Sequence, residues 1–477
     1  MSVSDNTIKK DYFWNTVGSG IYALSSMLLA FAVMHIAGPD DGGIFGFGFS
    51  TFGQQMFIIA YFGIRPFHIT DSGYEYSYSD YRKLRRITAL GAVAAAFLYL
   101  GFMYITDSYT FRKAAIVFLL ALYKTADGIA DLYESECQRV GVLWAGGKEL
   151  AIRTSLASLT LIISLVCTGD VLISSALAVL AQFICIIVFK RYSETRFFDT
   201  AAGRGRVASA EDSRNKSAVN AAASESSPIY ADSENLSAAK SGAGAATLSD
   251  SIGSSYGKKG CTKLAKSTLL LFLSVFVDFY IFSASKYAID HYLTDADSGI
   301  FNILFMPTSV IYLAANFIIK PYMTRLSVLY EDRELDAFEA IVKKLRTAVI
   351  LMSAAALAGS LLLGRPVLSI LEFMLGAEYK GALSSRSLIF VFIILGGCFY
   401  AASNLYYYIL VIMRRQKLIF IIYLVVAALA FVLSNAVVAR FGLEGAAVIY
   451  PCYMAAATTA FAFACGNILK NERNKDL

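Results

Sequence analysis

Charged residues are scarce in this sequence. Asp, Glu, Lys and Arg make up only 16% of its 477 residues, whereas they make up about a quarter of a typical soluble domain. Hydrophobic residues make up 57%, and the mean hydropathy is +0.57. A soluble core cannot hide that much apolar surface, so we expect the chain to sit in lipid. The composition excludes a soluble enzyme, a disordered protein and a secreted disulfide scaffold.

Residues that hold metals or form disulfides are few and dispersed. The three histidines, His35, His68 and His291, are far apart in the sequence, and the seven cysteines include no CxxC pair. Most of the cysteines lie in apolar runs, where cysteine behaves as a small hydrophobic residue. We therefore expect no catalytic residue, no metal site, no disulfide and no cofactor.

Long apolar runs dominate instead. Each is long enough to cross a bilayer, for which about 20 residues suffice, and helices are expected because every backbone group in hydrocarbon must be paired internally. The first run is also too long to be the hydrophobic region of a signal peptide. We expect about twelve transmembrane helices, near 14–37, 43–64, 87–105, 114–132, 150–168, 171–189, 264–285, 300–319, 347–363, 387–412, 418–438 and 445–468.

Lysine and arginine set the expected orientation. With the N-terminus in the cytoplasm, 34 of the 42 basic residues fall in cytoplasmic segments and 7 in outer loops. The ratio remains 22 to 7 when the long central segment is left out. Because short cytoplasmic loops carry the basic excess, both termini are expected in the cytoplasm. The net charge of +6 is thus a topology signal, and no nucleic-acid partner is expected.

The central segment has a different composition. Of the 50 residues from 201 to 250, 28 are Ala, Ser or Gly, and such a stretch cannot bury enough apolar surface to offset its ordering entropy. We expect a disordered cytoplasmic linker at 193–262, which separates a six-helix lobe at 1–192 from a second six-helix lobe at 263–477.

The two halves also repeat. Residues 40–45 read DDGGIF and residues 295–301 read DADSGIF. About twenty residues later, each half has a basic residue before a proline, Arg65-Pro66 and Lys320-Pro321. Both halves begin in the cytoplasm, so the repeat is parallel, as in transporters whose substrate path lies between two halves.

The fourth apolar run contains Lys124, Asp127 and Asp131. Their spacing places all three on one helix face, and each charge costs about 2.5–3.5 kcal/mol near the bilayer centre. This face should therefore look into the protein or a wet cavity. Two interpretations stay open: a site for an anionic substrate or a coupling ion, or a structural charge pair.

Five basic residues are candidates for binding an anionic substrate, because guanidinium and ammonium groups recognise phosphate. Ordinary anchoring at the membrane surface is the alternative for those at helix ends. Three acidic residues within spans are candidates for a coupling ion or a charge pair. The basic candidates are Arg65, Lys124, Arg153, Lys286 and Lys320, and the acidic ones are Asp127, Asp131 and Asp278.

Several stretches resemble one family. They are residues 11–20 (DYFWNTVGSG), 43–46 (GIFG), 62–67 (FGIRPF), 285–290 (SKYAID), 301–307 (FNILFMP) and 441–446 (FGLEGA). Together they resemble bacterial polysaccharide repeat-unit flippases of the Wzx type, in the multidrug/oligosaccharidyl-lipid/polysaccharide exporter superfamily. The likeness covers nearly the whole chain except the linker.

The resemblance implies an all-helical membrane protein with two pseudo-symmetric six-helix bundles around a central cationic cavity. It implies transport of undecaprenyl-pyrophosphate-linked oligosaccharide across the bacterial cytoplasmic membrane by alternating access. Membrane lipids, a polymerase and glycosyltransferases of the same pathway are the partners it implies.

Two other functions stay open. A membrane glycosyltransferase or polymerase would use outer carboxylates such as Asp40 and Asp295 to hold a metal. It also needs a large outer loop, and the longest one expected here spans only about 364–386. A small-molecule exporter of the same superfamily would share the fold and differ in its substrate.

Overall fold

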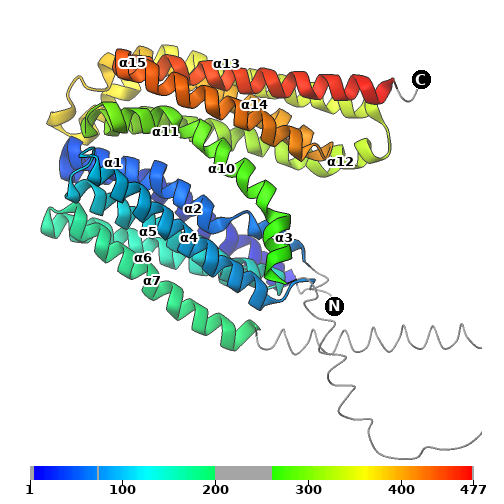
Figure 1. Ribbon diagram of the computed structural model, residues 1–477, viewed down its shortest axis with the longest axis horizontal. Helices are drawn as coiled ribbons and strands as arrows, with labels where there is room; N and C mark the ends of the chain where they lie inside the picture. The colour runs from blue at the N-terminus through cyan, green and yellow to red at the C-terminus, as the bar shows by residue number, and fades with distance from the viewer. Residues whose placement is uncertain (1–4, 72–74, 199–259, 475–477) are drawn as a thin grey trace, which may run out of the picture.

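The structure is a computed structural model that describes residues 5–71, 75–198 and 260–474. Every regular element in these ranges is helical, and the long helices run roughly parallel to one another in two groups (Figure 1). The all-helical fold expected from the apolar runs is confirmed.

The helices of the first half follow one another with short connections. The bounds are α1 Asp5–Phe47, a π-helical turn Gly48–Phe52, α2 Gly53–Tyr61, α3 Ile64–Thr70, α4 Tyr78–Ile105, α5 Phe111–Arg139, α6 Leu143–Thr168, α7 Val171–Ser193 and a second π-helical turn Glu194–Phe198.

The second half is also a series of helices with short connections. Its bounds are α10 Cys261–Tyr292, α11 Asp295–Ile319, a 3₁₀ turn Lys320–Tyr322, α12 Met323–Glu331, α13 Leu335–Leu375, 3₁₀ turns Ala377–Tyr379 and Ser384–Arg386, α14 Ser387–Ile412 and α15 Gln416–Arg473.

Two of these helices fold back on themselves at a glycine with positive φ. In α1 the reversal is at Gly38 (φ 83°), and in α15 it is at Gly442 (φ 60°). A β-carbon on Gly42 would lie 2.7 Å from the Cα of Met34, although residues eight apart in a straight helix are separated by about 12 Å. Helix α15 therefore contributes two passes, whereas α1 contributes one pass and the start of a second, which continues through the π-helical turn and α2.

The described residues contain nine segments long and apolar enough to cross a membrane. The two that fold back, Lys9–Ile69 and Gln416–Arg473, count twice. Helix α5 is not among the nine because it carries too many charges, yet it lies parallel to its neighbours (Figure 1). With α5 included, the described residues make twelve passes, the number that the sequence predicts.

The predicted start of the linker at residue 193 is wrong. Residues 193–198 are helical: the Ser193 hydroxyl donates to the carbonyl of Phe189, and the buried Phe198 ring lies 5.3 Å from the Tyr78 ring. Phe197 and Phe198 supply the apolar surface that keeps this turn on the first half. The predicted end is also too late, because Cys261 and Thr262 already belong to α10. Residues 199–259 of the predicted linker lie outside the described residues.

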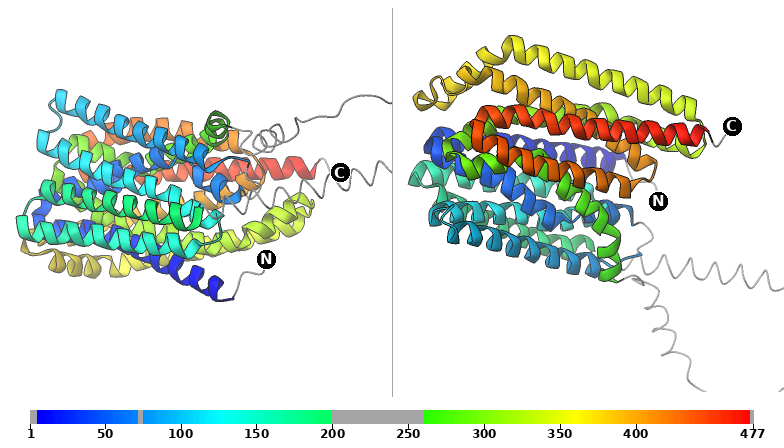
Figure 2. Two further views of the ribbon diagram at one scale, coloured as in Figure 1. Left: turned by 90° about the horizontal axis from the view of Figure 1, so that it is seen from below. Right: turned by 45° about the horizontal axis from the view of Figure 1, so that its top comes forward.

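Each half has its own apolar core, and one helix crosses between them. Ile116, Leu120 and Leu161 belong to the core of the first half, whereas Ile393, Leu410 and Phe461 belong to that of the second. Helix α10 packs on α2 and α4 through its N-terminal part and on α15 through the rest (Figures 1 and 2). We call the two groups the N lobe and the C lobe.

The lobes touch where the chain reverses at Gly38, on the side that the sequence places outside the cell. We call this side the outer end and the side holding both termini the inner end. Gly43 and Gly299, which occupy equivalent positions in the repeat, face each other, and a β-carbon on Gly299 would lie 3.0 Å from the Cα of Gly43. The Tyr379 hydroxyl donates to the carbonyl of Met34 across the same contact, at 2.9 Å.

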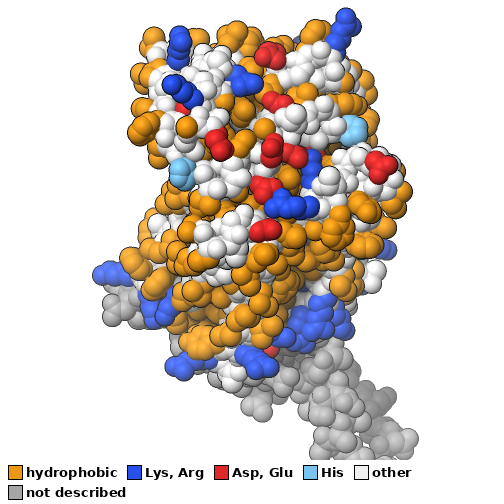
Figure 3. Space-filling view, turned by 90° about the vertical axis from the view of Figure 1, so that its left-hand side faces the viewer, with side chains coloured by type: hydrophobic (Ala, Val, Ile, Leu, Met, Phe, Trp, Pro, Cys, Tyr) orange, Lys and Arg blue, Asp and Glu red, His pale blue; other side chains and the backbone are white. Residues whose placement is uncertain are grey.

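Figure 3 views the molecule from its outer end. Charged side chains gather around the middle of this end, and hydrophobic side chains lie on both flanks (Figure 3). This distribution fits a protein whose sides face lipid and whose ends face water.

The glycine contact generates a prediction. A β-carbon on Gly43 would lie 1.8 Å from the carbonyl oxygen of Asp295, so Gly43→Ala forces α1 and α11 apart. We expect a loss of about 1–3 kcal/mol in the free energy of unfolding, which is typical of overpacking. Thermal unfolding of the purified protein in detergent measures this. Gly101→Ala is the control because nothing lies within 4 Å of its added carbon; equal effects of the two variants would contradict the close contact.

Candidate functional site

A stripe of polar side chains follows one face of α5. Lys124, Asp127 and Asp131 share this face as predicted, and Glu134 extends it toward the inner end. All four are buried. Because α5 carries these charges inside the bundle, its neighbours have to supply partners for them.

Lys124 lies at the outer end of the stripe. Its Nζ is 3.7 Å from the Oδ2 of Asp127 and 4.0 Å from the centre of the Phe49 ring. The Tyr22 hydroxyl of α1 donates to the same carboxylate oxygen at 3.3 Å. Lys124 is thus held by a charge pair, a cation–π contact and the nearby hydroxyl of Tyr22.

Arg153 of α6 is the centre of the network. Its guanidinium donates to Asp127, to Glu149 at 2.8 Å and to Glu134 at 3.2 Å. It also donates to the amide oxygen of Gln182 at 2.7 Å. Only 1% of Arg153 is exposed, so one buried cation joins three carboxylates from α5 and α6.

Arg65 of α3 forms the accessible edge. Its NH1 lies 2.6 Å from Asp131 and 3.4 Å from Glu134, and 28% of its side chain is exposed. The other oxygen of Asp131 accepts from the fully buried Arg85 at 2.7 Å. A cavity of about 200 Å³ borders Arg65 and Glu134 and extends between α1 and α6.

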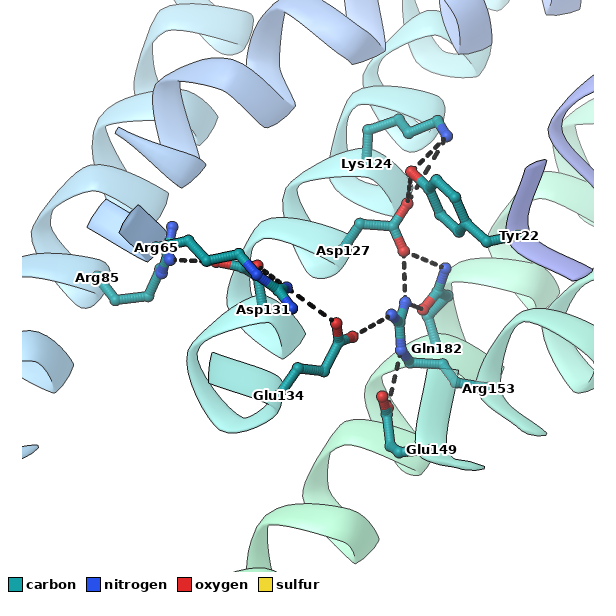
Figure 4. A network of polar contacts seen from close by, with 10 residues as sticks. All are labelled: Tyr22, Arg65, Arg85, Lys124, Asp127, Asp131, Glu134, Glu149, Arg153 and Gln182. Atoms are coloured by element: carbon teal, nitrogen blue, oxygen red, sulfur yellow. Dashed lines mark hydrogen bonds and ion pairs between the residues drawn. The ribbon is translucent and has the colours of Figure 1, made fainter. Parts of the chain in front are cut away.

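These contacts make one continuous network of four basic and four acidic side chains (Figure 4). Its formal charges cancel. The predicted residues Arg65, Lys124, Arg153, Asp127 and Asp131 are therefore brought together, but as a paired network within the N lobe. An anion can bind here only by replacing a carboxylate as the partner of a cation.

Five members of the network were not among the predicted residues: Tyr22, Arg85, Glu134, Glu149 and Gln182. Two of them, Glu134 and Glu149, could have been predicted from their spacing along the helix. Glu134 follows Asp131 by three residues on the same stripe, and Glu149 precedes Arg153 by four, which places an acid next to a base on one helix face. Tyr22, Arg85 and Gln182 come from other helices, and only the packing of the lobe brings them here.

The remaining candidates lie in the C lobe, apart from this network. Asp278 of α10 accepts from the Tyr400 hydroxyl at 3.0 Å. It borders a cavity of about 210 Å³, and half of the residues that line it are tyrosines: Tyr312, Tyr400, Tyr407, Tyr408 and Tyr423. Within the part of the chain that the structure describes, Asp278 has no basic partner.

Lys286 lies two turns further along α10, where 6% of it is exposed. Its Nζ lies 4.2 Å from the centre of the Phe305 ring, so it does not extend to lipid headgroups. Lys320 is exposed after the end of α11. Although it is the repeat equivalent of Arg65, the structure does not bring the two together.

A second set of charges joins the lobes at the outer end. Lys113 of α5 lies 2.9 Å from Asp290 of α10 and 2.6 Å from Asp295 of α11. The Tyr109 hydroxyl donates to the other oxygen of Asp290. Together with the glycine contact, this ion cluster closes the outer end.

Arg153 gives a stability prediction. Removing it leaves Asp127, Glu134 and Glu149 buried with weaker compensation, and breaking a buried ion pair in this way costs about 3–5 kcal/mol. We expect Arg153→Met to lower the free energy of unfolding in detergent by that amount. The control is Arg112→Met, which removes an arginine that is 43% exposed and paired with Asp41, and should cost less than about 1 kcal/mol. Similar losses in the two variants would rule out a central role for Arg153.

Comparisons with known proteins bear on the fold. No protein-family model matches the chain, and no curated protein sequence is similar to it. Solved structures do match. The lipid II flippase MurJ in an inward closed conformation has a TM-score of 0.55 at 10% identity, over 97% of this chain and 87% of its own.

Two transporters match similarly. The Vibrio cholerae MATE transporter VcmN in its bent form has a TM-score of 0.53 at 12% identity and covers 98% of each chain. A eukaryotic MATE transporter has a TM-score of 0.52 at 7% identity, over 98% of this chain and 95% of its own. The chain therefore has the two-lobed helical fold that MATE transporters share with the MurJ flippase.

Proposed function

We propose that the chain is a flippase for undecaprenyl-pyrophosphate-linked oligosaccharide, a polysaccharide or teichoic-acid repeat unit. It moves this lipid from the inner to the outer leaflet of the bacterial cytoplasmic membrane by alternating access. The observation that carries the proposal is an arginine, Arg65, at the accessible edge of a buried charge network in a transporter-type fold. The sequence resemblance to Wzx-type flippases supports the choice of cargo.

Arg65 suits a pyrophosphate because guanidinium binds phosphate oxygens with two parallel hydrogen bonds. In this structure the guanidinium of Arg65 is paired with Asp131 and Glu134. A phosphate that reaches the neighbouring cavity exchanges places with one of these carboxylates. The buried Arg85, which also contacts Asp131, and the buried Arg153, which also contacts Glu134, then keep the released acid paired. The lobe therefore tolerates the exchange.

The membrane potential favours this direction of transport. An inside-negative potential drives anions outward by about 2.3 kcal/mol per charge per 100 mV, which is roughly 4–5 kcal/mol for a dianion. The main obstacle is desolvation of the headgroup. A polar path lowers this barrier while the prenyl chain stays in the bilayer.

Asp278 is the proposed site of a coupling cation. Its carboxylate, which has no basic partner among the described residues, borders a cavity lined by tyrosine rings. Carboxylate and aromatic faces both attract cations. The same cavity favours the second candidate function, a small-molecule exporter, since about 210 Å³ suits a small organic cation.

Depletion of the protein tests the cargo. We expect lipid-linked oligosaccharide to accumulate on the inner leaflet, where a membrane-impermeant periodate reagent oxidises it only after cells are lysed. Re-expression of the parental chain should restore labelling in intact cells. Continued appearance of the lipid-linked sugar outside depleted cells would reject the flippase function, and loss of resistance to cationic compounds instead would favour the exporter.

Substitutions in the network test the role of its cations. We expect Arg65→Ala and Lys124→Ala each to reduce export severalfold, because one removes the phosphate partner and the other removes the cation beside Asp127. Lys124→Arg should retain more export than Lys124→Ala because it keeps the charge. Export is measured as outer-leaflet oligosaccharide per amount of folded protein.

The matched control is Arg82→Ala. Arg82 lies on α4 and pairs with Glu194 at 3.5 Å, so it is an inner-end arginine with a carboxylate partner outside the network. Parental export in Arg65→Ala and Lys124→Ala, made singly and together, would overturn the role of these cations while leaving the flippase function intact.

A further inference from the structure

A crevice of about 840 Å³ opens at the inner end. Three segments surround it: the N-terminal part of α10, the turn that joins α14 to α15, and the last turns of α15. Both ends of α15 take part because this helix folds back at Gly442. The walls are Leu270, residues 414–418, Ile468, Asn471 and Glu472.

The crevice lies between the lobes. At this level α10 packs on the N lobe, where the Phe272 ring stacks on the Phe62 ring at 4.3 Å between centres. The opposite wall belongs to the C lobe, because Ile468 packs against the core of that lobe. The crevice is thus the inner mouth of the space between lobes whose outer ends are closed.

Among the described residues that line it, three are basic, Arg414, Arg415 and Lys417, and one is acidic, Glu472. Arg414 pairs with Glu331, but its side chain is 83% exposed, and such surface pairs contribute little. Arg415 is 3.6 Å from Glu472, and Lys417 has no ion-pair partner among the described residues. Unlike the Arg65 network, this site has positive charge available for an anion.

The turn holds one of these arginines in a costly conformation. Arg414 has φ +56°, in the left-handed region that residues other than glycine and asparagine rarely adopt. The Arg414 and Arg415 amides donate to Val411 and Leu410 at 3.0 Å each, which fixes the turn. The backbone strain therefore falls on a residue whose side chain lines the crevice.

Apolar side chains complete the walls. Leu270, Leu418 and Ile468 lie beside the basic residues, so one surface offers both cations and hydrocarbon contacts. That combination fits an amphiphilic anion better than a free phosphate. The volume is also in the range of sites for small molecules, about 300–1,000 Å³.

We propose that this crevice is the loading site at which the pyrophosphate of a polyprenyl-linked cargo first binds, before it reaches Arg65. The headgroup contacts Arg414, Arg415 and Lys417, and the first isoprene units contact Leu270, Leu418 and Ile468. This inference rests on the proposed function and adds a second anion site to it, about which the resemblance to known flippases says nothing.

Binding of farnesyl diphosphate, a short polyprenyl diphosphate, tests the site without transport. The full chain is placed in phosphatidylcholine nanodiscs and Kd is measured by microscale thermophoresis. Replacing Arg414, Arg415 and Lys417 together by Gln should weaken binding about tenfold or more, the size expected for lost hydrogen bonds to charged groups. Inorganic pyrophosphate should bind more weakly than farnesyl diphosphate, because it lacks the apolar part.

The matched control removes the same number of charges from the same lobe. Lys343, Lys344 and Arg346 are exposed on α13 and outside the crevice, and their joint replacement by Gln should change Kd less than twofold. A second variant, Glu472→Gln, should tighten binding, because it removes the one acid of the crevice. A misfolded protein cannot produce such a gain.

Three results would overturn the loading site. The first is equal weakening of farnesyl diphosphate binding in the crevice and control triple variants, and the second is unchanged binding in the crevice triple variant. The third is full competition by phosphatidylglycerol added to the nanodiscs, which would assign the crevice to an ordinary anionic lipid. None of them bears on whether depletion of the protein traps lipid-linked oligosaccharide inside, so the proposed function is judged separately.

Discussion

The pairing of buried charge on α5 is the constraint on which the N lobe depends. This helix is too polar to qualify as a membrane span on composition, and hydrocarbon penalises each unpaired charge by several kcal/mol. Arginines from three neighbouring helices, Arg65, Arg85 and Arg153, supply the missing partners. The positions of α3, α4 and α6 around α5 follow from this requirement as much as from apolar packing.

The two lobes differ in how they pair their buried polar side chains. In the N lobe, Tyr22 of the first pass and Lys124 of the fourth both lie against Asp127. In the C lobe, the corresponding first and fourth passes place Asp278 against Tyr400, with no base nearby among the described residues. The repeat thus preserves where polar groups meet but not their charge.

The two ends of the molecule differ in closure and in charge. The outer end is closed by two glycines of the repeat and by Lys113, which reaches across to Asp290 and Asp295. The inner end has a crevice with three basic side chains. Helix α10 runs from the inner end, where Phe272 contacts Phe62 of the N lobe, to the outer end, where Asp290 pairs with Lys113. It also packs on α15 of the C lobe, so it links the two lobes along their length.

The sequence by itself determined the membrane class, the twelve passes and the stripe on α5, because hydropathy and helical spacing are local properties. The repeat of Gly43 and Gly299 was also readable, although its role as the contact between lobes was not. Helical periodicity placed Lys124, Asp127 and Asp131 on one face, and the cost of burying charge predicted an interior location.

Only the tertiary structure decided which partners those charges have. Arg85 of α4 and Gln182 of α7 lie 46 and 55 residues from their partners on α5, and nothing in their local sequence marks them. Packing also places Arg65 and Lys320 apart and buries Lys286 in the C lobe. It brings Arg414, Arg415 and Lys417 together around a crevice between the lobes. Electrostatic pairing acts through space. The sequence pattern therefore shows that a buried charge needs a partner, but only the folded chain shows which residue is that partner.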